Sequence, residues 1–408
     1  MTEVDVVPER HIRVLYLTHH APWPTTSGGR RRDAELVQRL GDRTELDVWA
    51  VSRTPVLDRR SASDVPGRRI LVFADEAARR SYPTRDSAAA RERLRAATSA
   101  CPFDVVHVEG HYLVHLVPAA WRDRTVVAEH NVESHLLTQR AALGHPQAAA
   151  LLADLPTLRR QEESVWRQVR TVIALSAEDR DRIRQRVPTA AVHLLPNGAD
   201  HVPLDQPQRL DTAPPRDTVP SVDGRRVPRI GFLANFGYGP NLDAVHWLVA
   251  DVFPRVLSQL PEAELLLAGA GMEGLFAGGV PERTVPLGWV DDVTTFWPRV
   301  DVVVCPLRIG GGVKVKMVEA VRAGCAIVST SVGVEGLPGA VRDAVVVADR
   351  ADEFAAAVTA LCRDRALRDR VRLRTAAARG ALPTWDEAAN GVLALWTSVA
   401  ADAAVTTS

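Results

Sequence analysis

The stretch CPLRIGGGVKVKMVEA, from Cys305 to Ala320, carries the clearest structural signal in the chain. It follows Val300–Val304, an apolar and mostly β-branched run that predicts a buried strand of a parallel sheet. Three consecutive glycines, Gly310, Gly311 and Gly312, then let the backbone approach a ligand without interference from Cβ atoms. From Val313 onward, apolar residues recur at helical spacing. The stretch therefore predicts a strand, a glycine loop and a helix in succession, as in α/β proteins.

The glycine loop and the helix behind it also predict a binding site. Backbone N–H groups at the start of a helix, together with the helix dipole, favour an anion such as a phosphate. Lys316 and Glu319 are three residues apart, so both project from the same side of the helix, away from its apolar face. A cation beside phosphates and a carboxylate that accepts from sugar hydroxyls would together bind a nucleotide sugar. Because glycine-rich loops are weak motifs, the alternative here is a plain turn followed by a solvated lysine–glutamate pair.

Length, charge and cysteine content narrow the class of protein. With 408 residues the chain is long enough for two domains. Its 50 basic and 50 acidic residues balance, so no overall field recruits nucleic acid. The four cysteines are scattered without a C-x-x-C pair, which argues against a disulfide framework or a structural zinc site. The polar first residues and the lack of any run of ~20 apolar residues predict a cytoplasmic protein without a signal peptide or membrane span.

The front of the chain repeats the pattern of strand, glycine loop and helix. Ile12–Leu17 predicts the first strand, and a helix is expected to run to about Leu40. The glycines between them, Gly28 and Gly29, do not follow G-x-G-x-x-G, and no acidic residue ends the next strand, at 45–51. A dinucleotide cofactor is therefore not expected. We expect the two glycines to let the backbone approach a phosphate or a sugar, the alternative being a tight turn before a helix.

Alternating strand and helix patterns fill two halves of similar length. We predict an α/β fold of two doubly wound, Rossmann-like domains, each with a parallel sheet, that face each other across a cleft. The first domain is expected at residues 11–204, a linker at 205–227 and the second domain at 228–384, and a last helix at 385–402 is expected to pack back on the first domain. Beyond the strands already named, we expect strands at Arg69–Phe73, Asp104–Val108, Thr125–Ala128, Thr171–Leu175, Ala191–Leu195, Arg229–Ala234, Leu265–Ala268, Thr284–Leu287, Ala326–Ser329 and Ala344–Val347, with a helix at Asn241–Leu260.

Ligands of such domains bind at the carboxyl ends of the strands. Four segments of the second half fall there. They are Asn235–Asn241, Gly288–Val290, the loop and helix from Gly310 to Glu319, and Ser331–Leu337, which contributes Glu335 as a further carboxylate.

These segments resemble a known family. PLRIGGGVKVKMVEAVRAGCAIVSTSVGVEGL, with LGWVDDV and GFLANFGYGPNLDAVHWL upstream, is similar to the retaining glycosyltransferases of the GT-B fold in the large family-4 group. TTSGGRRRDAELVQRL and LLPNGAD extend the resemblance, more weakly, into the first half. The resemblance implies a nucleoside diphosphate sugar as donor, held mainly by the second domain, with no metal or redox cofactor.

The resemblance also assigns roles to individual residues. It implies that Glu319 accepts from the donor ribose hydroxyls, that the Val290 backbone reads the base, and that Gly28 and Gly29 line the phosphate and sugar pocket. The chain departs from the common motif, because Gly311 stands where the first of two glutamates is usual.

The basic pair that usually follows the first strand of the second domain is also missing. A subset of the family, with a PLRxGGGxxxKxxEA loop, shares both departures and has a basic residue in the glycine helix. We therefore expect Lys316, with Lys314 as a second candidate, to stabilise the departing diphosphate.

Other candidate residues lie outside the glycine helix. His130 ends a first-domain strand, and the resemblance implies that it contacts the donor sugar or the acceptor; the alternative is a cap of the next helix. His111 is a weaker candidate of the same kind. The Asp179–Asp181 pair copies a metal-binding D-x-D motif but lies within a helix, where such residues point apart, so we interpret it as surface charge. Trp289 and Trp297 are interpreted as core residues.

Together these observations predict a metal-independent glycosyltransferase that uses a UDP-sugar or a related donor and retains configuration. In the family account, the acceptor attacks from the front face and the leaving phosphate takes its proton, so no protein nucleophile is required. A sugar-nucleotide 2-epimerase and a non-catalytic sugar-nucleotide sensor remain as alternatives. The acceptor is left open among a polysaccharide, a lipid-linked sugar and a small molecule, and peripheral membrane contact is compatible with each.

Overall fold

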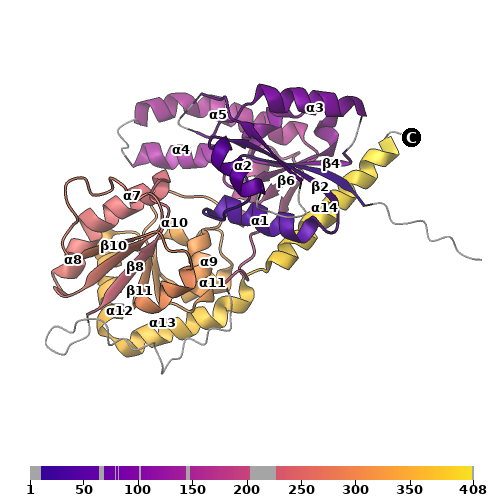
Figure 1. Cartoon of the computed structure of the whole chain (residues 1–408). Coiled ribbons are helices and arrows are strands. Elements are labelled where there is room, and N and C mark those ends of the chain that lie inside the picture. The colour runs from indigo at the N-terminus through magenta and orange to yellow at the C-terminus, as the bar shows by residue number, and fades with distance from the viewer. Residues whose placement is uncertain are drawn as a thin grey trace, which may run out of the picture. The chain divides into compact units, whose positions relative to one another are not determined.

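A computed structural model of the chain describes residues 11–63, 69–78, 80, 82–100, 103–143, 148–202 and 227–406. Their contacts divide them into two compact units, which are described separately (Figure 1). Of the described residues, those within 11–137, 148–196 and 385–406 form unit 1, and those within 138–143, 197–202 and 227–384 form unit 2. Apart from Val227, the linker expected at 205–227 lies outside the described residues.

Unit 1 is built on a seven-stranded sheet in the order β3-β2-β1-β4-β5-β6-β7. Every strand pairs in parallel with its neighbours, which confirms the parallel sheet predicted for this half. The strands are β1 Arg13–Thr18, β2 Glu45–Ser52, β3 Arg69–Ala74, β4 Val105–Glu109, β5 Thr125–Glu129, β6 Thr171–Ala174 and β7 Val192–Leu194.

The alternation of side chains along β1 gives this sheet a hydrophobic core on each face. Val14 and Tyr16 pack into one core, with α1 and α14. Leu15 and Leu17 pack into the other, with α3. A strand buried on both faces is continuously apolar, which is why the parallel sheet was predictable from sequence.

Helix α14 belongs to unit 1 although it ends the chain (Figure 1). Val392 and Trp396 are fully buried in the core on the face of the sheet that carries Val14 and Tyr16. At its start, Arg39 Nε of α1 donates to Asp386 Oδ1 at 2.7 Å. The helices of this part are α1 Gly28–Leu40, α2 Pro55–Ser63, α3 Ala88–Ala100, α4 Glu133–Ala142 (grouped with unit 2 from Thr138), α5 Ala148–Gln168, α6 Ala177–Arg186 and α14 Trp385–Thr406, with 3-10 turns η1 His111–Leu116 and η2 Ala119–Arg124.

Unit 2 has its own six-stranded sheet, in the order β10-β9-β8-β11-β12-β13. Its pairings are also all parallel. One hydrophobic core joins the strands to the helices. The strands are β8 Arg229–Leu233, β9 Glu264–Ala268, β10 Thr284–Gly288, β11 Val302–Cys305, β12 Ile327–Ser329 and β13 Val346–Val347.

The helix expected at Asn241–Leu260 is a helical run of three pieces, of which the middle one is a π-helix at Leu248–Val252. Pro254 follows, and its ring and missing N–H disfavour an ordinary α-helical turn before it, so the wider turn accommodates the proline. The helical elements of unit 2 are α7 Gly239–Trp247, η4 Leu248–Val252, α8 Phe253–Leu257, η5 Val293–Thr295, η6 Trp297–Arg299, α9 Val315–Arg322, α10 Ser331–Val334, α11 Gly339–Ala344, α12 Ala351–Arg363, α13 Arg365–Ala378 and η7 Arg379–Ala381.

The strand order of each sheet reverses at one position, between β1 and β4 in unit 1 and between β8 and β11 in unit 2. Chain segments diverge to opposite faces there and leave a crevice at the carboxyl ends of the two strands. The loops that follow these four strands are therefore where functional side chains are expected. In the described part of the chain, no helix combines the length and the apolar composition that a membrane span requires.

Candidate functional site

The glycine loop of unit 2 connects β11 to α9. Helix α9 begins at Val315, whereas the helical spacing in the sequence begins at Val313. Gly312 has a φ of 55°, which a residue with a side chain rarely adopts. A Cβ on Gly310 would lie 3.0 Å from Lys314 Cε and 3.1 Å from Val332 Cγ1. The glycines thus allow the tight path by which the loop returns to the helix.

Lys316 is in the first turn of α9, and its side chain lies beside β8, one of the two strands between which the strand order reverses. Its Nζ donates to Asn241 Oδ1 at 2.5 Å and lies 4.8 Å from the centroid of the Phe232 ring. The Asn241 amide in turn donates to the Asn235 carbonyl at 2.8 Å, which fixes its orientation. Burial lowers the pKa of Lys316 to about 8. The site therefore holds a cation that has lost hydration and that an anionic ligand would stabilise.

Lys314 has different surroundings. Its Nζ donates to the Gly312 carbonyl at 3.1 Å and to the Glu335 carbonyl at 3.4 Å, and lies 3.7 Å from Glu335 Oε2. The structure thus brings together Lys314 and Glu335, two residues predicted for the site. Lys314 therefore stabilises the glycine loop through its contacts with Gly312 and Glu335, whereas the Lys316 side chain contacts Phe232 of β8.

Glu319 lies one turn after Lys316 and is buried. Its Oε1 pairs with His201 Nε2 at 3.2 Å. Sequence reasoning did not identify His201, although it directly follows the LLPNGAD segment. Asn235 and Asn241 were singled out only as the ends of a segment, and no sequence pattern showed that Asn241 would bond to Lys316.

In the Gly288–Val290 segment, the side chains of Trp289 and Val290 differ in how far they are buried. Val290 is partly buried against the core of unit 2. Trp289 is 51% exposed, and its indole N–H donates to Asp291 Oδ1 at 2.7 Å, so the interpretation of Trp289 as a core residue is wrong. Trp297 is 3% exposed, which confirms its interpretation as core. Trp289 follows the glycine that ends β10, where the chain leaves the sheet.

In unit 1, Gly28 and Gly29 form the first turn of α1, with Ser27 as N-cap. A Cβ on Gly29 would lie 3.2 Å from His20 Cε1 and 3.5 Å from His130 Cε1. The structure therefore places Gly29 beside His130, as two residues of one site require. The lack of a side chain at Gly29 keeps the helix N-terminus open beside the two imidazoles.

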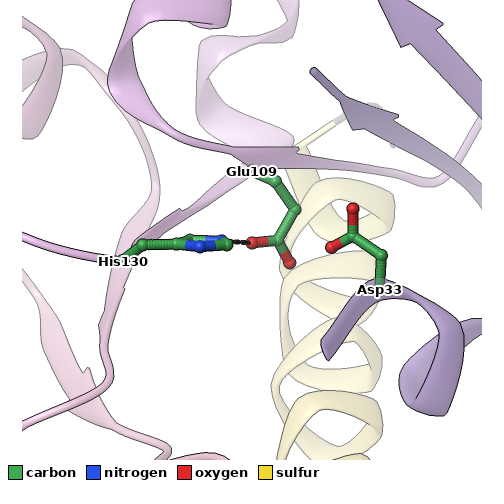
Figure 2. Close-up of side chains that lie close together, drawn as sticks. All are labelled: Asp33, Glu109 and His130. Atoms are coloured by element: carbon green, nitrogen blue, oxygen red, sulfur yellow. Dashed lines mark hydrogen bonds and ion pairs between the residues drawn. The ribbon is translucent and has the colours of Figure 1, made fainter. Parts of the chain in front are cut away.

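The His130 side chain bonds to Glu109, and Figure 2 shows the two side chains directed at each other. The contact joins His130 Nε2 to Glu109 Oε2. Burial alone would lower the pKa of His130, but the charge and hydrogen bond of Glu109 outweigh burial and raise it. Helix α4 begins at Glu133, and the Leu136 N–H bonds to the Val132 carbonyl, so Val132 and not His130 stands at the cap position of that helix.

Glu109 and Asp33 form a buried polar network that sequence reasoning missed. Both side chains are fully buried, and the Tyr16 hydroxyl lies 2.5 Å from Glu109 Oε1 and 3.0 Å from Asp33 Oδ1. Thr18 donates to Asp33 Oδ2 at 2.6 Å, and His107 Nε2 lies 2.9 Å from Glu109 Oε1. A usable signal exists in the sequence, because an acidic residue directly after an apolar strand run is unusual unless it has partners.

Asp33, Glu109 and His130 also have the spacing of a metal site, since one ligand atom of each lies within 4.8 Å of the others (Figure 2). However, their oxygens already accept from protein donors. The Arg32 guanidinium, itself fully buried, lies 3.5 Å from Glu109 Oε1. A fixed cation and several N–H and O–H donors therefore occupy the sites that a metal would use.

Two weaker sequence candidates lie elsewhere in unit 1. His111 Nδ1 pairs with Glu129 Oε2 at 3.1 Å; burial alone would lower its pKa, but Glu129 raises it to about 9. In the D-x-D segment, Asp181 is exposed, but Asp179 is fully buried and bonds to Arg182 at 2.8 Å. The interpretation of both aspartates as surface charge is therefore wrong for Asp179.

Two family models match the chain. Residues 26–202 match the model described as Glycosyltransferase Family 4, and residues 227–364 match the model described as Glycosyl transferases group 1. No curated protein sequence matches the chain.

Solved structures match over nearly the whole chain. Anabaena HepE in complex with UDP and glucose has a TM-score of 0.65 and 14% identity, over 95% of this chain and 100% of HepE. A glycosyltransferase from Rickettsia africae has a TM-score of 0.60 and 14% identity, over 95% and 98% of the two chains. WaaG, a glycosyltransferase involved in lipopolysaccharide biosynthesis, has a TM-score of 0.61 and 13% identity, over 93% and 98%. With its two parallel-sheet domains, the chain has the GT-B fold, as predicted.

Proposed function

We propose that this chain, which carries a Family 4 glycosyltransferase domain followed by a group 1 glycosyltransferase domain, transfers a sugar from a nucleoside diphosphate sugar to an acceptor hydroxyl with retention of configuration. The observation that carries the proposal is the partly buried Lys316, held by Asn241 beside a glycine loop at the β8–β11 position. HepE binds UDP and glucose, which supports a uridine donor for this chain as well. The glycosyltransferase domains favour transfer over epimerisation or sensing.

The donor is assigned mainly to unit 2. Gly310, Gly311 and Gly312 admit the diphosphate, Glu319 accepts from the ribose hydroxyls, and the Val290 backbone reads the base. Lys314 and Glu335 hold the loop in shape through their mutual contacts. In unit 1, Gly28, Gly29 and His130 are assigned to the phosphate and sugar oxygens.

The chemistry requires cleavage of the bond between the sugar C1 and the diphosphate oxygen. Negative charge builds on the β-phosphate as that bond breaks, and a pre-positioned cation at the departing oxygen lowers the barrier. Lys316 supplies this cation as a point charge, which needs no bidentate geometry. The acceptor oxygen forms the new bond to C1 on the same face, and its proton passes to the leaving phosphate. No protein nucleophile and no redox cofactor take part.

The test is a thermal-shift screen with UDP, GDP and TDP, followed by incubation of the enzyme with the corresponding sugar nucleotides. A ligand that binds only the folded protein raises its midpoint of unfolding. We expect UDP to give the largest rise and a UDP-sugar to be hydrolysed slowly or transferred. Binding without any turnover would instead identify a sensor, and isomerisation of the donor sugar would identify an epimerase.

Gly29→Ala is expected to reduce transfer at least about tenfold while the protein stays folded. The added methyl group would lie 3.2 Å from His20 Cε1 and would crowd the His130 ring at the helix start. Alanine is favoured over glycine in the middle of a helix by roughly 0.5–1 kcal/mol, which offsets part of the cost of this crowding, and the midpoint of unfolding would be measured alongside activity. Gly339→Ala is the matched control, because Gly339 opens α11 and its Cβ would contact nothing within 4 Å. Equal activity of the two variants would remove Gly29 from the site.

Chelation is expected to leave the activity unchanged. The enzyme would be assayed after dialysis against EDTA, with and without added Mg²⁺ or Mn²⁺. Because Lys316 provides the charge at the leaving phosphate, and the buried Glu109 pairs with Arg32 and His130, no step depends on a divalent ion. A loss of turnover that Mg²⁺ or Mn²⁺ restores would contradict metal independence.

A further inference from the structure

The hydrogen bonds around Glu109 define the proton positions of its neighbours. The Trp396 indole N–H, which can only donate, lies 3.1 Å from His107 Nδ1. His107 Nδ1 must therefore accept, and the neutral His107 ring carries its proton on Nε2. That Nε2–H donates to Glu109 Oε1 at 2.9 Å. Helix α14 thus orients Glu109 through His107.

The same network lacks one positive charge. Asp33 and Glu109 are fully buried carboxylates, whereas Arg32 is the fully buried guanidinium beside them. The Tyr16 hydroxyl lies between the carboxylates but has a single proton, so it can donate to only one of them at a time. Two buried negative charges and one buried positive charge are unfavourable unless a second cation or a proton is added.

The geometry selects His130 as that cation from three nearby histidines. His19 is excluded, because burial and the neighbouring His20 lower its pKa well below the ordinary value. His20 Nε2 lies 3.2 Å from Asp33 Oδ2, but without the geometry of a hydrogen bond. His130 Nε2, in contrast, makes a hydrogen bond to Glu109 Oε2.

We propose that His130 is held as an imidazolium by Glu109, and that it acts as a hydrogen-bond donor through Nδ1 and not as a general base. Glu109 is then a positioning residue, and Trp396 and His107 orient it. The Cε1–Nδ1 edge of His130 faces Gly29 at the first turn of α1, where a Cβ would lie 3.6 Å from Nδ1. Nδ1–H and the N-terminus of α1 both favour negative charge, so the group they bind is a phosphoryl or developing anionic oxygen.

This inference rests on the proposed function for its ligand, but not for the charge of His130. The groups facing His130 are Glu109 from β4, Arg32 and Asp33 from α1, and His19 and His20 from the loop after β1. Because Glu109 favours the charged ring, the folded-state pKa of His130 lies above that of the unfolded chain. The charge should therefore be lost at a higher pH than in the unfolded chain, as the pH rises through the folded-state pKa.

The direct test is an NMR titration of the histidine Cε1–H signals, with His130 assigned by its loss in His130→Gln. We expect His130 to titrate above its ordinary value and Glu109→Gln to move its midpoint to lower pH. Glu133→Gln is the control, since that carboxyl lies outside the network described for His130. A midpoint below the ordinary value, or one that Glu109→Gln leaves unchanged, overturns the proposal, whether or not the protein transfers sugar.

Kinetics provide a second test that does not depend on how well Glu109→Gln folds. Arginine is always charged and cannot act as a base at neutral pH. If His130 is a cationic donor, His130→Arg should retain at least about tenfold more activity than His130→Gln. Equal losses in the two variants would contradict a donor role, and rising activity with pH through the His130 midpoint would identify a base.

Discussion

Replacement of Lys316 by methionine is expected to reduce kcat for transfer by about 100- to 1000-fold, the typical loss when one pre-positioned group at a developing anion is removed. Methionine keeps the length of the chain above Phe232 but removes the charge that faces the departing phosphate. Steady-state assays with the preferred sugar nucleotide would measure the loss. The rise in unfolding midpoint on addition of UDP should shrink in parallel.

The ligand-free Lys316→Met protein should unfold at the same temperature as the wild type or above it. Burial lowers the pKa of Lys316 from 10.5 to about 8, so at neutral pH the folded state carries the cost of a poorly hydrated ammonium. The unfolded chain binds more protons between these two values, and wild-type stability should therefore rise with pH across that window. Methionine removes this dependence. The variant thus separates loss of catalysis from loss of folding.

Arg365→Met is the control for this substitution, because the Arg365 side chain is 78% exposed and pairs with Asp369, one turn further along the same helix. Lys314 and Lys316 are the only lysines among the 408 residues. Amine-reactive reagents should therefore modify few sites, and UDP should protect Lys316 from them. Wild-type turnover in Lys316→Met, or labelling of Lys316 that UDP does not change, would remove this residue from the site.

Glu319→Ala is expected to weaken donor binding by about 10- to 100-fold, because a hydrogen bond to a charged group contributes roughly 1.5–3 kcal/mol. The effect should appear in KM for the donor and in the Kd for UDP, while free phosphate binding is unaffected. Glu353→Ala, at a side chain that is 56% exposed, is the matched control.

Glu319 also holds His201, so Glu319→Ala removes two interactions at once. His201→Ala separates them. If Glu319 contacts the ribose, His201→Ala should weaken donor binding less than Glu319→Ala does. A 2′-deoxy donor should then bind the wild type less well than the natural donor does, whereas Glu319→Ala should bind the two donors equally. Equal losses in the two variants, with no effect of the 2′-hydroxyl, would assign Glu319 a purely structural role.

Much of the fold was predictable because parallel strands buried on both faces are continuous apolar runs. β1, β4, β5 and β11 each fall where such a run was identified. The boundaries of α7 to α8 were less predictable, since the π-turn before Pro254 depends on how the helix packs and not on periodicity. Trp289 shows the same limit, because its exposure depends on where β10 ends.

Only part of the candidate site could be predicted from the sequence. Lys316 and Glu319 could be identified because they lie one turn apart on one helix, shortly after three consecutive glycines. Asp33 and Glu109 could not, since they are 76 residues apart and meet only because β1 and β4 are neighbours in the sheet. Trp396 is further still from its partner His107, at a separation of 289 residues.

The sequence by itself determined which functional groups are available to the site. They are a glycine loop, the only two lysines, a carboxylate one turn beyond Lys316, and a histidine at a strand end. Local spacing is sufficient for this, because residues within one helical turn are neighbours wherever the helix is placed. Only the tertiary structure decided that Asn241 holds Lys316, that His201 pairs with Glu319, and that Glu109 holds His130. Those partners lie on segments that are far apart in the sequence, and only the folding of the chain brings them within hydrogen-bond distance.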